Sequence, residues 1–227
     1  MNRKHFLVIL GWLACRPILR AADKRLERST KLPLGQAASG GAVTCATDDF
    51  NRSNAGDLGA NWTTVTSETT FHVNANQADP LSTVADCGSW YSGTASPAFT
   101  DNQFSQCTMK TITGGSANDG TGVGVSVRVA SGARTYYRCV VNAAGSGNVE
   151  IAKSVAGTYT FLARTTSAFV SGDVLRLEVN GTTLTAYKNG VSILTIGDSS
   201  VTTGKPGLAY SSVLTAASVD DWSGGNL

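Results

Sequence analysis

The glutamates and histidines are the side chains best suited to acid–base chemistry, and both are scarce in this chain of 227 residues. Hydrolysis of a glycosidic bond needs two carboxyl groups about 5–10 Å apart, one as the acid and the other as nucleophile or base. The four glutamates, none spaced with another acid to form such a pair on one strand, are Glu27, Glu68, Glu150 and Glu178. Glu150 and Glu178 alternate with apolar neighbours, which is typical of the solvated face of a strand. We therefore expect no catalytic residues and a protein that is not an enzyme.

His72 is the histidine that a catalytic triad would have to use, because His5 lies in the N-terminal segment. It stands between Phe71 and Val73, with no cue beyond those of an ordinary surface or core histidine. The cysteines form no CxxC pair and no metal-type spacing with either histidine, so a zinc site is not expected. Four cysteines lie beyond residue 42 and could form up to two disulfides or remain buried thiols: Cys45, Cys87, Cys107 and Cys139.

Aromatic residues offer a different chemistry, because sugar rings stack on flat apolar faces and exchange hydrogen bonds with polar neighbours. The candidate ligand-binding aromatics are Trp90, Tyr91, Tyr136, Tyr137 and Tyr187. Neighbouring residues of a strand point to opposite faces, so at most one of each adjacent pair can lie in a core. Packing in the core or on the sheet surface is the alternative for all five.

These side chains must be positioned by β-structure, because the turn and alternation signals are those of strands. Residues 173–198 contain the pairs Asn180-Gly181 and Asn189-Gly190, each between short runs rich in Val, Leu, Ile and Thr. Asn-Gly tolerates the positive φ angles of tight hairpin turns, so this stretch predicts a three-stranded antiparallel meander. From residue 43 onward, many short strands at close spacing without helical periodicity indicate a sandwich or jelly roll.

The chain divides by charge and composition into three segments. Residues 1–31 carry eight basic and two acidic residues, a net charge of +6, whereas the remainder has ten basic and fourteen acidic residues, a net charge of −4. Residues 32–42 are typical of a flexible linker, and residues 43–227 form the expected β domain. Because that domain is mildly acidic, nucleic acid is not an expected partner.

The N-terminal arm, residues 1–31, combines an apolar run at 5–15 with a short basic amphipathic helix that starts near Pro17. We expect this arm to dock the domain on a larger protein assembly, with the apolar face of the helix in a groove of the partner. An export signal is the alternative. Contact with a membrane would follow only from a retained signal or from acylation at Cys15. Self-association into a homo-oligomer is left open.

Several phrases of the sequence occur as a set. They are Asp48-Asp49-Phe50-Asn51-Arg52, Leu58-Gly59-Ala60-Asn61-Trp62, Gln103-Phe104-Ser105-Gln106, residues 173–198 followed by Gly204-Lys205-Pro206-Gly207-Leu208, and Val219-Asp220-Asp221-Trp222-Ser223-Gly224. With this set, about residues 43–227 resemble a concanavalin A-like lectin/glucanase domain of the laminin-G-like branch. The resemblance implies a jelly-roll sandwich of two antiparallel sheets. Similar domains occur in secreted bacterial proteins and bacteriophage structural proteins. The glucanase relatives carry Glu-x-Asp-x-x-Glu on one strand, which this chain lacks.

The resemblance also implies that the first and last strands lie side by side, which would bring Asp48 and Asp49 next to Asp220 and Asp221. Four carboxylates placed together repel one another unless a hard cation such as Ca²⁺ neutralises them. Calcium occurs in related sandwiches, so these four aspartates are candidate metal ligands. The alternative is that strand alternation sends Asp48 and Asp49 to opposite faces, where they are solvated or cap turns.

Together these observations predict an all-β fold, a concanavalin A-like jelly-roll sandwich of two antiparallel sheets with a partly helical N-terminal arm. We expect a non-catalytic structural or binding module at a virion surface or in another extracellular setting. The favoured example is a bacteriophage decoration or fibre-type protein that contacts surface glycans. A secreted or lipid-anchored bacterial carbohydrate-binding protein is the alternative, and a glycan-cleaving enzyme is less favoured.

Overall fold

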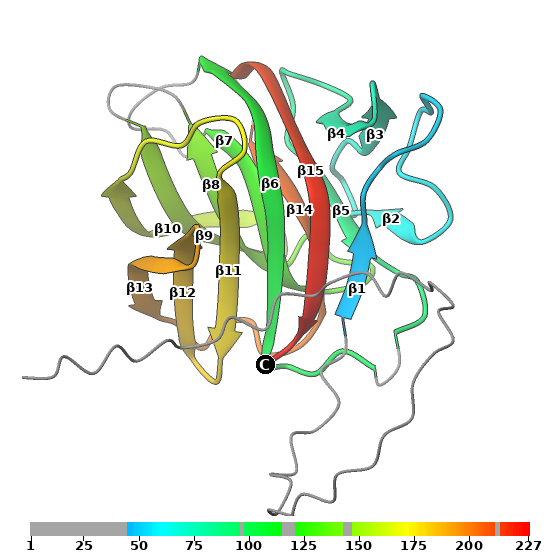
Figure 1. Cartoon of the computed structure of the whole chain (residues 1–227). Coiled ribbons are helices and arrows are strands. Elements are labelled where there is room, and N and C mark those ends of the chain that lie inside the picture. The colour runs from blue at the N-terminus through cyan, green and yellow to red at the C-terminus, as the bar shows by residue number, and fades with distance from the viewer. Residues whose placement is uncertain (1–44, 96–97, 115–120, 143–146, 212–213) are drawn as a thin grey trace, which may run out of the picture.

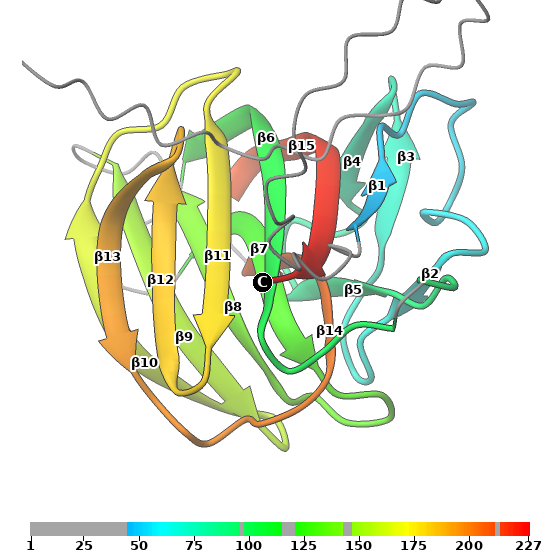
Figure 2. The same ribbon diagram turned by 60° about the horizontal axis from the view of Figure 1, so that its bottom comes forward.

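Two antiparallel β-sheets pack face to face in the computed structural model, which describes residues 45–95, 98–114, 121–142, 147–211 and 214–227 (Figures 1 and 2). Sheet A runs in the order β13 (Val191–Gly197), β12 (Thr183–Lys188), β11 (Val174–Asn180), β6 (Gln103–Gly114), β15 (Leu214–Asn226), β4 (Gln77–Pro80) and β3 (Phe71–Asn74), and β1 (Cys45–Asp48) also pairs with β15. Sheet B runs in the order β10 (Thr158–Thr166), β9 (Asn148–Val155), β8 (Tyr136–Asn142), β7 (Gly122–Val129), β14 (Lys205–Ser211), β5 (Cys87–Tyr91) and β2 (Trp62–Thr64).

The described residues contain no helix, and the two-sheet arrangement confirms the predicted jelly-roll sandwich. None of them therefore forms a helix long and apolar enough to cross a membrane. The N-terminal arm and the linker lie outside the described residues, so the predictions made for residues 1–42 stay predictions.

The predicted meander is present as β11, β12 and β13. Asn189 and Gly190 both have positive φ, 47° and 83°, and close the hairpin between β12 and β13 as expected. In the first hairpin Asn180 still pairs with Thr183, so the two-residue loop is Gly181-Thr182, with the positive φ of 58° at Gly181. The first turn thus starts one residue later than the Asn-Gly signal suggested, because glycine alone satisfies its backbone requirement.

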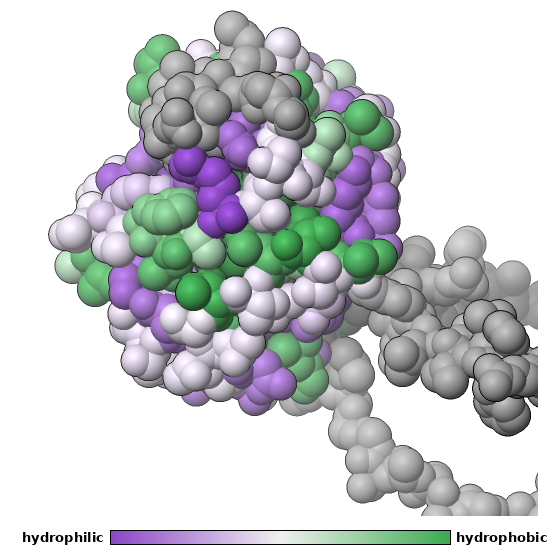
Figure 3. All heavy atoms as spheres, turned by 90° about the vertical axis from the view of Figure 1, so that its left-hand side faces the viewer, coloured by the Kyte–Doolittle hydropathy of each residue, from purple (hydrophilic) through white to green (hydrophobic). Residues whose placement is uncertain are grey.

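The core lies between the inward faces of the two sheets. Sheet A contributes Leu175, Leu177 and Val179, and sheet B contributes residues such as Val125 and Val127, all of them buried. Their alternation with polar neighbours follows the two-residue period of a strand. Where the edge strands β10 and β13 meet, apolar side chains also reach the surface between the two sheets (Figure 3).

Three of the four cysteines beyond residue 42 are free and buried: Cys87, Cys107 and Cys139. The buried-thiol interpretation therefore holds for them, and two disulfides among those four cysteines are excluded. Burial raises the pKa of Cys87 to about 11, and it raises the pKa of the other two thiols further. These thiols act as small apolar residues.

An aromatic cluster fills the core beneath the end of β1. The Trp222 ring lies 4.6 Å from that of Trp62 and stacks on Tyr91 at 5.3 Å between centroids. Phe50 contacts Trp62 at 6.0 Å and is fully buried, although its φ is +50°. The indole nitrogen of Trp222 donates to Ser105 Oγ over 2.9 Å. This cluster supports the surface that lies above it.

Candidate functional site

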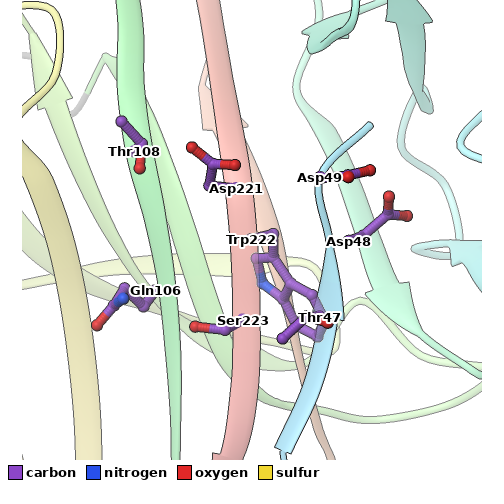
Figure 4. A pocket seen from close by; sticks show the side chains of 8 residues that line it. All are labelled: Thr47, Asp48, Asp49, Gln106, Thr108, Asp221, Trp222 and Ser223. Carbon is purple, nitrogen blue, oxygen red and sulfur yellow. The ribbon is translucent and has the colours of Figure 1, made fainter. Parts of the chain in front are cut away.

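A groove of about 430 Å³ opens on the outer face of sheet A, where β6, β15 and β1 run side by side (Figure 4). Side chains from all three strands and from the residue after β1 line it. They are Thr47, Asp48, Asp49, Gln106, Thr108, Asp221, Trp222 and Ser223. The predicted approach of the first and last strands is confirmed, because Asp48 pairs with Trp222 in the β1–β15 register.

A β-bulge in β15 sets the orientation of the groove's central residues. Asp220 pairs with Thr108 and Ser223 with Gln106, so Asp221 and Trp222 together stand opposite one residue of β6. Asp221 has a φ of +46°, a conformation that aspartate tolerates better than most residues. As a result the Asp221 side chain is exposed in the groove, whereas Trp222 is 1% exposed and enters the core.

Asp48 is occupied by partners from its own neighbourhood. Its two carboxylate oxygens accept hydrogen bonds from Arg52 over 2.6 and 3.0 Å, and from Trp62 Nε1 over 2.8 Å. Oδ1 also accepts from the backbone N–H of Phe50 over 2.9 Å, which holds that residue in its left-handed conformation. Asp48 therefore organises the loop after β1, and its charge is already balanced by Arg52.

Of the remaining three aspartates, two give the groove its negative character. Asp220 forms an ion pair with Lys110 at 3.1 Å, and Asp49 is exposed and accepts the backbone N–H of Asn51. Burial raises the pKa of Asp221, and the neighbouring charges of Asp220 and Asp49 raise it further against the opposing effect of Lys110. Asp49 and Asp221 are thus the two exposed carboxylates that line the groove without an ion-pair partner among the described residues.

A cage of four carboxylates around one calcium ion does not fit these contacts. Two of the four charges are balanced by Arg52 and Lys110. Across the described residues, no group of three or more His, Cys, Asp or Glu side chains is placed to hold a metal ion. Calcium binding therefore stays a prediction, with Asp49 and Asp221 as the carboxylates that a hard cation could still reach.

Three of the five candidate aromatics serve as packing residues in the structure. Tyr91 is 9% exposed and stacks on Trp222, and Tyr137 is fully buried with its hydroxyl donating to Asp198 over 2.6 Å. Tyr136, 4% exposed, donates to Glu68 Oε1 over 2.5 Å. A ring buried in this way offers no face to a sugar. Packing, the alternative given for these aromatics, therefore describes all three; alternation predicts which residues share a face but not what covers that face.

Trp90 and Tyr187 are partly exposed, and their roles as ligand contacts stay predictions. Trp90 lies on sheet B against Val65 and Val129, with Lys205 Nζ 5.1 Å from its ring centroid. Tyr187 lies on sheet A and lines a second hollow, of about 290 Å³, that also includes Glu178. Of these two residues, Tyr187 is the one on the same face of sheet A as the groove.

Four polar residues of the groove were not singled out from the sequence: Thr47, Gln106, Thr108 and Ser223. Each is a common strand residue without a motif of its own. Alternation could have predicted two of them. Gln106 and Thr108 flank Cys107, which is fully buried, so their side chains point to the opposite, outer face of the sheet.

No protein-family model matches the chain, and no curated protein sequence does. Solved structures do match. The carbohydrate-binding module CBM66 from Bacillus subtilis superposes with a TM-score of 0.58 at 20% identity, covering 74% of this chain and 96% of that one. The exoplasmic/lumenal domain of VIP36 in its Ca²⁺- and mannose-bound form gives 0.51 at 12% identity, covering 74% and 84%. Bacillus licheniformis β-glucanase gives 0.51 at 10% identity, covering 82% and 100%.

These neighbours have in common the concanavalin A-like jelly roll, and the chain has that fold. At such low identities the likeness concerns architecture. Function has to be argued from the groove itself.

Proposed function

We propose that the protein is a non-catalytic glycan-binding module and that the groove over β6, β15 and β1 is its binding site. The observation that carries this proposal is a groove lined by hydrogen-bonding side chains, with Thr47, Asp49 and Asp221 exposed and the others partly or largely buried, above a packed aromatic cluster. Asp49 and Asp221 supply acceptors, Gln106 supplies both donors and acceptors, and the hydroxyls of Thr108 and Ser223 complete the set. Sugar hydroxyls are recognised by such mixtures.

The charges of the groove select among glycans. The charges of Asp48 and Asp220 are balanced by Arg52 and Lys110, which leaves Asp49 and Asp221 as a net negative pair. A glycan that carries carboxylate or sulfate groups would meet repulsion in this groove. The ligand class is therefore a neutral glycan. The names of two structural neighbours, a carbohydrate-binding module and a mannose-bound lumenal domain, support glycan binding as such.

The test is a screen of the full-length chain on an array of neutral and acidic glycans, followed by calorimetry with the best neutral ligand. Replacing Asp221 with Asn should weaken binding about 10-fold or more, as expected for loss of a charged hydrogen-bond partner. The matched control is Asp101→Asn, the same change at an exposed site outside the groove. Equal affinities of the two variants, or binding of acidic glycans alone, would contradict the proposal.

The absence of catalysis needs its own measurement, because two carboxylates, Asp49 and Asp221, line one groove and the pKa of Asp221 is raised. Glycoside hydrolysis also uses two carboxyl groups, one on each side of the scissile bond. Incubation with the bound glycan should release no reducing ends. If reducing ends are released and the release is lost in Asp221→Asn, the protein is a glycan-cleaving enzyme and not a binding module.

For the setting, we propose display at a virion surface or on another extracellular assembly, through the arm at residues 1–31. The arm's net charge of +6 against −4 for the rest of the chain supports a separate partner for it. The alternative is a secreted or lipid-anchored bacterial protein. Mass spectrometry of the native N-terminus distinguishes them: an intact Met1 agrees with docking, and a start at or after Cys15 agrees with export.

A further inference from the structure

A separate hollow of about 300 Å³ lies on the outer face of sheet A beside the hairpin of β3 and β4. Its size falls at the lower end of small-molecule sites, which range over about 300–1,000 Å³. The polar residues that line it come from the hairpin, from β6 and from β15. They include His72, Asn74, Gln77, Asp79, Thr111 and Ser218.

The hairpin fixes two of these side chains opposite each other. Its two-residue loop, Ala75-Asn76, has φ angles of 50° and 61°, the geometry of a type I′ turn. In the resulting register His72 pairs with Asp79. Val73 and Ala78, one step along each strand, are fully buried, so the alternation directs His72 and Asp79 to the outer face.

Each of these two side chains has one buried polar atom without a hydrogen-bond partner, His72 Nδ1 and Asp79 Oδ1. The other oxygen of Asp79 accepts from Asn74 Nδ2 over 3.0 Å. Buried polar atoms are rarely left unsatisfied, because water or another partner is lost without replacement, so two of them at one paired position require an explanation. Burial also raises the pKa of Asp79, against the lowering effects of the hydrogen bond from Asn74 and of the nearby His72.

The chemistry of the two unsatisfied atoms, His72 Nδ1 and Asp79 Oδ1, determines which partner could satisfy them. A carboxylate oxygen can only accept, so its partner must be a donor, and an imidazole Nδ1 exchanges one hydrogen bond in either direction. Two neighbouring hydroxyl groups meet both requirements at once. The other lining groups also suit a sugar. Ser218 donates to Gln77 Oε1 over 2.6 Å, and both side chains are polar. Ala75, Pro80 and Ala216 are apolar and suit the apolar face of a sugar ring.

The hollow is separate from the groove but lies on the same face. Ser218 and Asp221 are three residues apart on β15, about 10 Å along the strand. The ion pair of Lys110 with Asp220 stands on the stretch between them. No side chain is shared by the linings of the two hollows.

We propose that this β3–β4 hollow is a second binding site, and that it takes a neutral saccharide unit through a vicinal diol held by Asp79 and His72. The inference rests on the two unsatisfied atoms and does not depend on the function proposed for the groove.

The test follows backbone amides 71–80 by NMR in the ¹⁵N-labelled full-length chain. The probes are the methyl glycosides of mannose, galactose and glucose, together with cis-1,2-cyclohexanediol and, as its control, cyclohexanol. The glycosides and the diol should shift the amides of His72 and Asp79, and cyclohexanol should not. Asp79→Asn should weaken this response about 10-fold, His72→Gln should weaken it as well, and the groove variant Asp221→Asn should leave it unchanged. Thermal melts confirm that each variant is folded.

Three results would overturn the site: no probe shifts the hairpin amides, cyclohexanol acts as well as the diol, or Asp79→Asn responds like the parent chain. A shift produced by Zn²⁺ or Ca²⁺ and by no diol would instead identify a cation site. Because groove binding is read from glycan affinity in Asp221→Asn, failure at the hairpin and failure at the groove are recorded independently.

Discussion

Sheets A and B each carry a glutamate held by one arginine and one tyrosine on the outer face, and the two differ in what surrounds them. On sheet B, Glu150 accepts from Arg164 over 2.5 Å and from the hydroxyl of Tyr159, and Arg138 lies over the tyrosine ring at 4.8 Å. The Glu150 side chain is 3% exposed.

On sheet A, Glu178 accepts from Arg176 over 2.7 Å and from the hydroxyl of Tyr187 over 2.9 Å. Its side chain is 24% exposed and lines a hollow. The same three residue types therefore bury one glutamate and leave the other partly exposed. The residue types in such a network therefore do not decide whether a face can bind a ligand. The side chains that cover the network decide it.

The sharpest test of this difference makes one chemical change on both faces. Glu150→Gln should lower the free energy of unfolding by about 3 kcal/mol, because it removes the charge of a buried carboxylate that accepts from both Arg164 and Tyr159. Glu178→Gln should cost less, about 1 kcal/mol, because the Glu178 side chain is 24% exposed and solvent partly screens its charge. Urea titrations of both variants measure the free energy of unfolding. Equal decreases in the two variants would show that the different burial of the two glutamates does not affect stability.

A second contrast compares two aspartates with opposite pKa shifts. Burial raises the pKa of Asp198, but hydrogen bonds from Lys153, Tyr137 and Ser200 outweigh it and hold that pKa well below its usual range. Asp198 therefore adds stability above its ordinary pKa of about 4, and this stability is lost as the pH falls through the lower value of the folded state. Asp198→Asn should cost about 2 kcal/mol at pH 7 and progressively less below pH 4.

Asp221 in the groove should show the opposite sign. Its raised pKa means that the fold favours the protonated form, so its contribution to stability is present at low pH and is lost as the pH rises through the raised value. Asp221→Asn should then leave stability at pH 7 unchanged or slightly higher. Melting curves from pH 3 to pH 8 test both variants, and a loss of stability in Asp221→Asn at pH 7 would contradict the assignment of this residue to an open site.

The aromatic residues provide a smaller effect. Trp90 on sheet B packs against Val65, Val129 and Tyr136, so Trp90→Ala should lower the free energy of unfolding by about 1–2 kcal/mol, below the range for a fully buried tryptophan. Its glycan affinity should stay within about 2-fold of the parent chain, a difference of less than about 0.5 kcal/mol. Loss of binding without loss of stability would place a ligand site on sheet B.

Calcium should have the smallest effect. With Asp48 and Asp220 already paired to Arg52 and Lys110, only Asp49 and Asp221 remain for the ion, and few ligands give weak binding. Removing divalent cations with a chelator should leave the melting temperature unchanged, and calorimetry with Ca²⁺ should give little heat. A clear rise in melting temperature on adding Ca²⁺ would show that the groove holds the ion more tightly than its ion pairs suggest.

Much of the fold could be predicted from the sequence, because its strongest signals are local. The Asn189-Gly190 turn and the alternation of Leu175, Leu177 and Val179 depend on neighbouring residues alone, and the structure confirms them. The adjacency of the first and last strands could be expected only through the resemblance to known sandwiches, since residues 45–48 and 222–225 are far apart in the chain.

The chemistry of the site could be predicted less well, because it depends on contacts between strands. Lys110 on β6 neutralises Asp220 on β15, and no sequence pattern around Lys110 predicts this ion pair. The bulge that exposes Asp221 is a register shift between β6 and β15, which the alternation of β15 alone does not reveal. Likewise, the burial of Tyr136 and Tyr137 depends on what packs above and below sheet B.

The bulge in β15 also limits how binding specificity can diverge. One backbone irregularity places Asp221 in the groove and Trp222 in the core, so inserting or deleting a residue there would exchange the two and disrupt both at once. Changes of ligand preference should therefore accumulate at Thr47, Gln106 and Thr108, whose side chains can vary without moving the aromatic cluster. A library randomised at those three positions should yield many folded variants, and one randomised in length around Asp221 should yield few.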